Sequence, residues 1–80
     1  MPTADNFLDD IPASALTERQ REIAALIAEG LSNQDTADRL GLERHTVSDH
    51  VAQILWRLGA TDRIQVVIWA TRHRLCGPRY

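Results

Sequence analysis

The chain of 80 residues contains no lysine, a single cysteine and only four aromatic side chains. The lone Cys76 excludes an internal disulfide and suits a reducing compartment. No apolar run reaches the roughly 20 residues that a membrane span needs, and no signal peptide is visible. These absences predict a cytoplasmic protein that does not cross a membrane.

The charge is unevenly distributed along the chain, whose formal net charge is −2. Three of the acidic residues lie before residue 17 without a basic neighbour, whereas residues 17–80 hold all nine arginines and eight acids, a net of +1. Because every basic side chain is an arginine, each can make bidentate contacts with phosphate or guanine. The acid excess therefore belongs to the N-terminal segment, and the remainder is near neutral.

The sequence has no pattern typical of an enzyme or of a metal site. His45 and His50 are five residues apart and face different sides of a helix, and His73 is remote in sequence. His50 falls among apolar residues and is expected to be a hydrogen-bonded core residue, while Cys76 has no positioned base nearby. We therefore expect no catalytic activity, no metal and no cofactor.

The hydrophobic fraction of 44% and the length predict one small folded domain. Residues 1–15 carry prolines and acids and are expected to form an acidic arm or a short helical turn. Residues 16–76 are expected to form the folded domain, and residues 77–80 a tail. Four helices are predicted and no strand, because no stretch alternates with period two. The helices are bounded by capping residues and turn glycines, over about 17–30, 32–41, 44–58 and 61–75.

The last two helices carry apolar stripes at helical spacing. The stripe of the third consists of Val47, His50, Val51, Ile54, Leu55 and Leu58. In the fourth we expect the core to be contacted by Ile64, Val67, Ile68 and Leu75. A second strip, Val66, Trp69 and Ala70, then faces outward, and the two strips together are wider than one small core needs.

Two helices joined through a glycine turn are typical of a helix-turn-helix, in which the second helix enters the DNA major groove. The face of the third helix opposite its core stripe consists of short or forked polar side chains with one alanine: Arg44, His45, Ser48, Asp49 and Ala52. Such side chains can pair with base edges, although most polar helix faces are simply solvated. The free amides at the start of the second helix, near Ser32 and Asn33, offer a phosphate site.

From Leu16 to about Leu75 the sequence resembles the LuxR-type (NarL/FixJ-like) DNA-binding domain of bacterial transcription regulators. The similarity rests on "LTERQREIAALIAEGLSN", "TVSDHV" and "LGATDRIQVVIWA". It implies an all-α, four-helix domain whose fourth helix makes the dimer contact. The chain departs from the family where a lysine is common at Ser48 and a second basic residue at Ala52, and Thr36 brings a hydroxyl to a core position.

The sequence thus predicts a sequence-specific transcription regulator that binds double-stranded DNA as a homodimer and can also contact RNA polymerase. The residues expected to contact DNA are Ser32, Asn33, Arg44, His45, Thr46, Ser48, Asp49, Gln53 and Arg57. Those expected at the dimer interface are Val66, Trp69, Ala70 and His73. The chain has no room for a sensory domain, so it is either a stand-alone regulator, which its initial Met1 favours, or an excised domain. The alternative is an interaction module of the same fold that acts on a polymerase subunit or another regulator.

Overall fold

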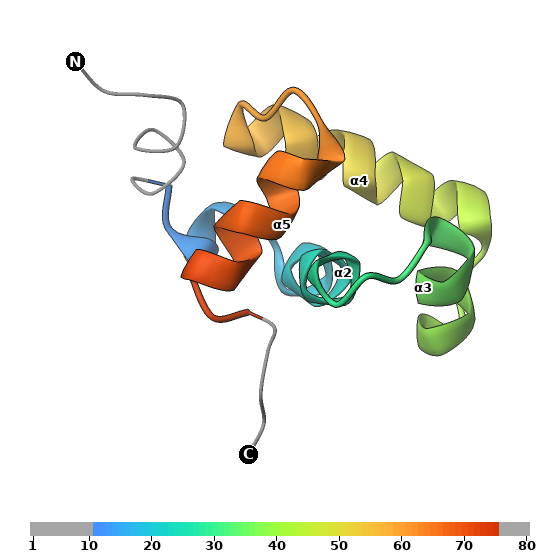
Figure 1. Ribbon diagram of the computed structural model, residues 1–80. Helices are drawn as coiled ribbons and strands as arrows, with labels where there is room; N and C mark the ends of the chain where they lie inside the picture. The colour runs from blue at the N-terminus through green and yellow to red at the C-terminus, as the bar shows by residue number, and fades with distance from the viewer. Residues whose placement is uncertain (1–10, 76–80) are drawn as a thin grey trace.

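The computed structural model describes residues 11–75, and within this range the fold is all-helical, as the sequence predicts (Figure 1). A short 3-10 turn, η1 (Ala13–Ala15), precedes four α-helices. These are α2 (Glu18–Ala28), α3 (Asn33–Leu40), α4 (Arg44–Leu58) and α5 (Arg63–Arg72). Each predicted helix is present, although the last ends three residues earlier than expected.

Side-chain caps define the starts of three of the helices. The Thr17 hydroxyl accepts a hydrogen bond from the backbone amide of Gln20, and the Thr17 backbone amide donates to the Gln20 side-chain oxygen, which completes a capping box at α2. Ser32 caps α3, and Asp62 caps α5. In contrast, α4 follows Glu43, whose side chain makes no capping bond. The local sequence therefore specifies three helix starts, whereas the start of α4 depends on the turn before it.

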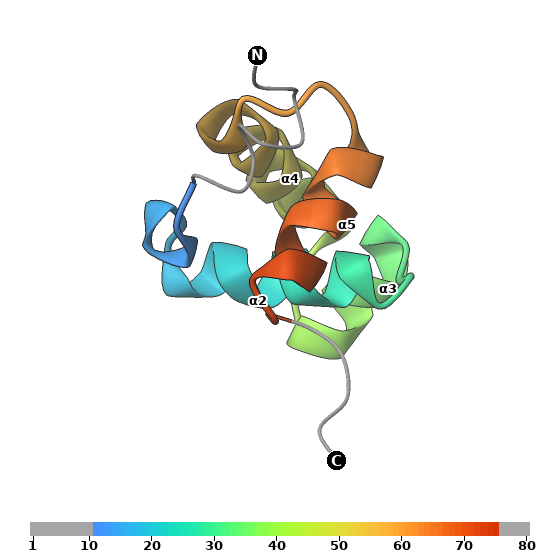
Figure 2. The same ribbon diagram turned by 60° about the vertical axis from the view of Figure 1, so that its left-hand side comes forward.

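The core lies where α2, α4 and α5 meet, with α5 crossing α2 as Figure 2 shows. Its largest fully buried apolar side chains come from these three helices, while α3 contributes Ala37. A small residue at that position lets α3 approach α4 closely. The fully buried apolar side chains are Ile23, Ala24, Ile27, Ala37, Val47, Ile54, Leu58, Val66, Trp69 and Ala70.

The orientation of α5 differs from the one predicted, although Val67 and Leu75 pack against the core as expected. Val66, Trp69 and Ala70 are 0% exposed, whereas Ile64 is 68% exposed, so the strip expected to face outward is the core face. Two stripes with the same helical spacing run along this helix, and spacing alone cannot choose between them. Burying the stripe that contains Trp69 removes the larger apolar area from water, which explains the choice.

The residues just before α2, from Ile11 to Leu16, pack on the domain. The Trp69 indole Nε1 donates to the Ile11 carbonyl oxygen at 2.8 Å, and the Arg21 guanidinium donates to the Leu16 carbonyl oxygen at 2.7 Å. Ile11 and Ala13 also pack against the core. Ile11, Ala13 and Leu16 are therefore in contact with the folded helices. The three acidic residues of the N-terminal segment, Cys76 and the tail over 77–80 lie outside the described residues.

Candidate nucleic-acid interface

The turn between α3 and α4 is closed by a glycine in the left-handed conformation. Gly41 has φ of 72° and ψ of 32°, and its amide bonds to the carbonyl oxygen of Ala37. The amide of Leu42 donates to the same oxygen at 2.9 Å, so two bonds end α3 and direct the chain into α4. Nothing lies within 4 Å of where a Cβ would stand on Gly41, so it is the backbone conformation that favours glycine.

The polar face predicted on α4 is largely exposed. Arg44, His45, Ser48 and Asp49 are all exposed, whereas Thr46 is half-buried. His45 Nδ1 lies 3.9 Å from the Glu43 carboxylate, and both side chains are about three-quarters exposed. A pair so open to water contributes little to stability. This face is therefore free to meet a ligand, with Arg44 as its cation.

Two residues predicted to contact DNA have partners within the domain. Gln53 accepts a hydrogen bond at 2.9 Å from the side-chain amide of Gln20, a residue that is 2% exposed. The Arg57 guanidinium donates to the Ala15 carbonyl oxygen at 3.3 Å. Both side chains thus connect α4 to α2 or to the N-terminal segment, which their polar character alone did not reveal.

The sequence assigned no role to Arg63, and the structure gives it one. Its guanidinium donates to the Asn33 Oδ1 at 2.7 Å and to the Leu31 carbonyl oxygen at 2.8 Å. The Asn33 side-chain amide in turn donates to the Ser48 hydroxyl at 3.2 Å. One clue was available: Arg63 is the first residue of α5, where the helix dipole disfavours a cation. An arginine there calls for a specific partner.

The starts of α3 and α5 and the first residue of α4 surround a shallow hollow of about 470 Å³. Asn33 and Gln34 are the first residues of α3, whose initial amides have no intrahelical acceptor. The hollow is lined by Gly30, Leu31, Ser32, Asn33, Gln34, Arg44 and Arg63. Two arginines and a helix N-terminus thus face the same open space, next to the exposed face of α4.

Two buried polar atoms in the helix-turn-helix have no partner among residues 11–75. They are the hydroxyl oxygen of Thr36, which is 0% exposed, and Nδ1 of His50. The expectation for Thr36 is confirmed, since its hydroxyl is in the core. That for His50 is wrong, because its ring is half-buried and the buried nitrogen is not hydrogen-bonded.

The remaining histidine contacts its own helix. His73 Nδ1 lies 3.0 Å from the Trp69 carbonyl oxygen, and the two rings are 4.8 Å apart between centroids. Within residues 11–75 no group of three potential ligands could hold a metal ion. No helix in that range is long and apolar enough to cross a membrane.

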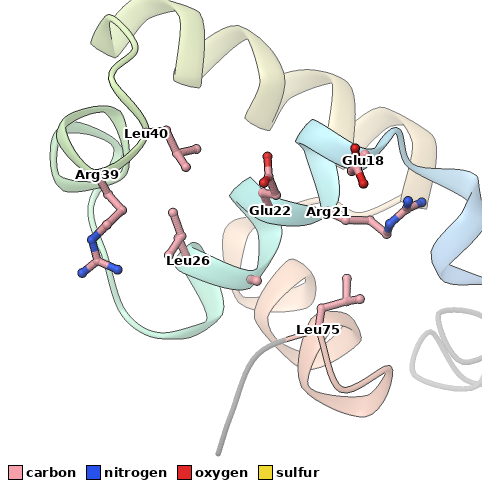
Figure 3. Close-up of a pocket in the computed structure, with 8 residues that line it drawn as sticks. Glu18, Arg21, Glu22, Leu26, Arg39, Leu40 and Leu75 are labelled. Atoms are coloured by element: carbon pink, nitrogen blue, oxygen red, sulfur yellow. The ribbon is translucent and has the colours of Figure 1, made fainter. Parts of the chain in front are cut away.

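A second hollow, of about 430 Å³, lies elsewhere on the molecule (Figure 3). Its apolar floor is formed by Leu26 of α2, Leu40 of α3 and Leu75, and no residue of α4 lines it. The charged side chains around it come from α2 and α3: Glu18, Arg21, Glu22 and Arg39. The mixture of both signs does not select a ligand of one charge, and this hollow is separate from the polar face of α4.

Three capped helices, a glycine turn and an exposed polar face on the helix after it define a helix-turn-helix domain. The family model for bacterial regulatory proteins of the luxR family matches residues 14–70. The chain belongs to this family. The match confirms the class that the sequence predicts, a DNA-binding transcription regulator.

Curated relatives include the response regulator protein VraR of Staphylococcus aureus, Staphylococcus saprophyticus and Staphylococcus epidermidis. Each is 48% identical to this chain over 60 residues, which is 75% of this chain and 29% of the relative. The chain therefore spans less than a third of the length of these proteins.

Proposed function

We propose that this domain reads DNA by inserting the exposed face of α4 into the major groove. The observation that carries the proposal is the position of Arg44, Ser48 and Asp49, which are exposed together on the helix that follows the Gly41 turn. In this arrangement arginine can donate to guanine and aspartate can accept from cytosine N4. DNA lies in the bacterial cytoplasm, so we infer that the protein acts there.

The hollow lined by Ser32, Asn33, Arg44 and Arg63 is the proposed phosphate site. Free amides and the positive end of the α3 dipole favour an anion, and the exposed Arg44 adds a full charge. Gln53 and Arg57 become secondary candidates, because each would have to give up a contact within the domain to reach DNA. Phosphate contacts orient the protein, and base contacts specify the sequence.

Selection of bound sites from random DNA tests this function directly. We expect an enriched motif for the wild-type chain, and a relaxed motif with higher non-specific affinity for Asp49→Ala, because a negative charge leaves the groove face. Asp38→Ala removes an equal charge from an exposed position on α3 and should leave the motif unchanged. Failure of the wild-type chain to enrich any motif would refute the proposal.

The proposed homodimer contact on α5 moves to the face left open by the core. Ile64 is 68% exposed and Ile68 is half-buried, so these two side chains replace Val66, Trp69 and Ala70 as the apolar strip available to a partner. A two-fold axis beside this strip pairs it with its own copy. Two recognition helices then lie about 34 Å apart, one turn of DNA.

Sedimentation with a palindromic duplex measures the number of chains bound at saturation. We expect two chains per duplex for the wild-type protein and weaker pairing of the two chains for Ile64→Ser. Trp56→Ser is the control, since Trp56 is an exposed large apolar residue on α4 and not on α5. A wild-type complex with one chain per palindrome would contradict the dimer.

The second candidate function is an interaction module, and the exposure of Trp56 favours it. This side chain is 82% exposed on α4, and exposed aromatic residues commonly anchor protein interfaces. A polymerase subunit or another regulator is the partner we propose for it. Under this alternative Trp56→Ser abolishes partner binding, whereas no DNA sequence is enriched.

A further inference from the structure

A chain of hydrogen bonds joins three helices at the start of the proposed recognition surface. Arg63 of α5 donates to the Asn33 side-chain oxygen at 2.7 Å, and the Asn33 side-chain nitrogen donates to the Ser48 hydroxyl at 3.2 Å. We call these three residues the Asn33 bridge. Arg63 also holds the Leu31 carbonyl oxygen at 2.8 Å, so its guanidinium is fixed to the turn before α3.

The direction of these bonds follows from the chemistry of the groups. Arginine has only donors, so the atom of Asn33 that faces Arg63 has to be its carbonyl oxygen. The nitrogen of the same amide, which has only donors, then faces Ser48. The Ser48 hydroxyl therefore accepts a hydrogen bond, and its hydrogen has to point elsewhere. Arg63 thus determines whether the Ser48 hydroxyl accepts or donates in its bond with Asn33, although Arg63 lies on another helix.

We infer that Ser48 acts as a hydrogen-bond donor toward an acceptor atom on a base edge, and that Arg63 and Asn33 are the positioning residues that impose this role. Ser48 is exposed on the α4 face, so its hydrogen is available to a ligand. A hydroxyl that already accepts one bond is a stronger donor. The inference rests on the proposed DNA-binding function and adds a rule of specificity to it.

The major groove offers Ser48 a clear choice of partners. Guanine presents acceptors at N7 and O6, thymine at O4 and adenine at N7, whereas cytosine presents only the N4 amino donor. Serine by itself can pair with a donor or an acceptor, but the Asn33 bridge favours the acceptor. On the contacted strand, the domain should therefore discriminate most strongly against cytosine.

The substitution Asn33→Asp reverses the direction of the hydrogen bond with Ser48 while keeping the side chain the same size. A carboxylate has only acceptors, so one oxygen keeps Arg63 and the other requires Ser48 to donate to it. Ser48 then presents only lone pairs to the DNA. Gln34→Glu is the matched control, because it adds the same charge at the next residue, whose side chain bonds to Asp38 and not to Ser48. Aspartate also suits the first turn of a helix, so α3 should fold normally.

Sites selected from random DNA should be compared for the wild-type chain, Asn33→Asp, Gln34→Glu and Ser48→Ala. We expect one position of the motif to lose its preference in Ser48→Ala. At that position Asn33→Asp should shift the preference roughly 3- to 10-fold toward cytosine or another base presenting an amino donor, the size of one hydrogen bond. Gln34→Glu should lower affinity for all sequences and keep the wild-type motif.

The remaining outcomes separate this inference from the proposed function. If Asn33→Asp gives the motif of Gln34→Glu, the Asn33 bridge does not set the role of Ser48, and the inference fails while DNA recognition stands. If Ser48→Ala weakens binding equally for every sequence, Ser48 contacts phosphate oxygen and the assignment to a base is wrong. If the wild-type chain enriches no motif at all, the proposed function fails first.

Discussion

Thr36 buries a hydroxyl that has no hydrogen-bond partner among residues 11–75 and is 0% exposed. A buried polar group left unpaired costs about 1–3 kcal/mol of desolvation. Valine has the same shape without the hydroxyl. We therefore expect Thr36→Val to stabilise the domain by about 1 kcal/mol or more, measured as an increase in the free energy of unfolding in urea.

Thr17→Val is the control for this experiment, because it makes the same chemical change where the hydroxyl is used. Thr17 accepts the capping bond of α2 from Gln20 at 3.1 Å, and losing an N-cap costs about 1 kcal/mol. The same substitution should thus change stability in opposite directions at the two sites. Equal destabilisation by both would show that Thr36 has a partner.

Individual contacts were the least predictable features of the sequence. The burial of Thr36 followed from the resemblance to the family, and the exposure of Arg44, Ser48 and Asp49 followed from their position opposite the stripe. The role of Arg63 did not, because its partners are 30 and 32 residues away along the chain. Long-range pairing of side chains depends on how helices pack, which periodicity within one helix does not contain.

Gly41 sets the geometry of the element that joins α3 to α4. Its φ of 72° is disfavoured for residues with a Cβ, and no atom lies where that Cβ would stand. We expect Gly41→Ala to destabilise the domain by about 1 kcal/mol through backbone strain alone. Gly41→Asn should cost less, because asparagine tolerates the left-handed region. Thermal unfolding of the two variants measures the difference, and a larger loss for asparagine would contradict this explanation.

The burial of Trp69 makes α5 a core element. Truncating a fully buried tryptophan costs about 3–5 kcal/mol, a large part of the stability of a small domain. Trp69→Ala should therefore unfold most of the protein at 37 °C, or lower its melting temperature sharply. Ile64→Ala on the exposed side should change the free energy of unfolding by no more than about 0.5 kcal/mol. Circular dichroism during heating compares the two, and similar melting curves would be inconsistent with this orientation of α5.

Helix boundaries were more predictable than helix faces. The predicted helix starts and ends agree with the structure at Thr17, Ser32, Gly41 and Gly59. Capping is a local interaction, so residues close together in the sequence are enough to predict it. The face of α5 was ambiguous, since two apolar stripes share its spacing. Only the docking of α5 against α2 separates them, and that is a tertiary event.

At the scale of the whole molecule, few of the arginines near the proposed recognition surface, within residues 11–75, are available to DNA. Arg57 and Arg63 already bond to carbonyl oxygens of the domain, and Arg44 is exposed beside the phosphate hollow. Each phosphate neutralised contributes about −0.9 to the slope of log affinity against log salt concentration. We expect a shallow slope. Arg44→Gln should reduce the magnitude of this slope by about 1 per subunit, whereas Arg39→Gln, on the other side of α3, should leave it unchanged. Equal effects of the two variants would argue against Arg44 as a phosphate anchor.

The two tryptophans lie at opposite extremes of exposure, 82% for Trp56 and 0% for Trp69. One indole is therefore open to a dissolved quencher, whereas the other is shielded for as long as the chain stays folded. Acrylamide should quench the emission of Trp56 first and leave a blue-shifted component from Trp69. In the Trp56→Phe variant, the residual fluorescence then reports both folding and the attachment of Ile11, whose carbonyl oxygen is the partner of that indole. The fluorescence of Trp69 therefore reports whether Ile11 remains packed on the domain.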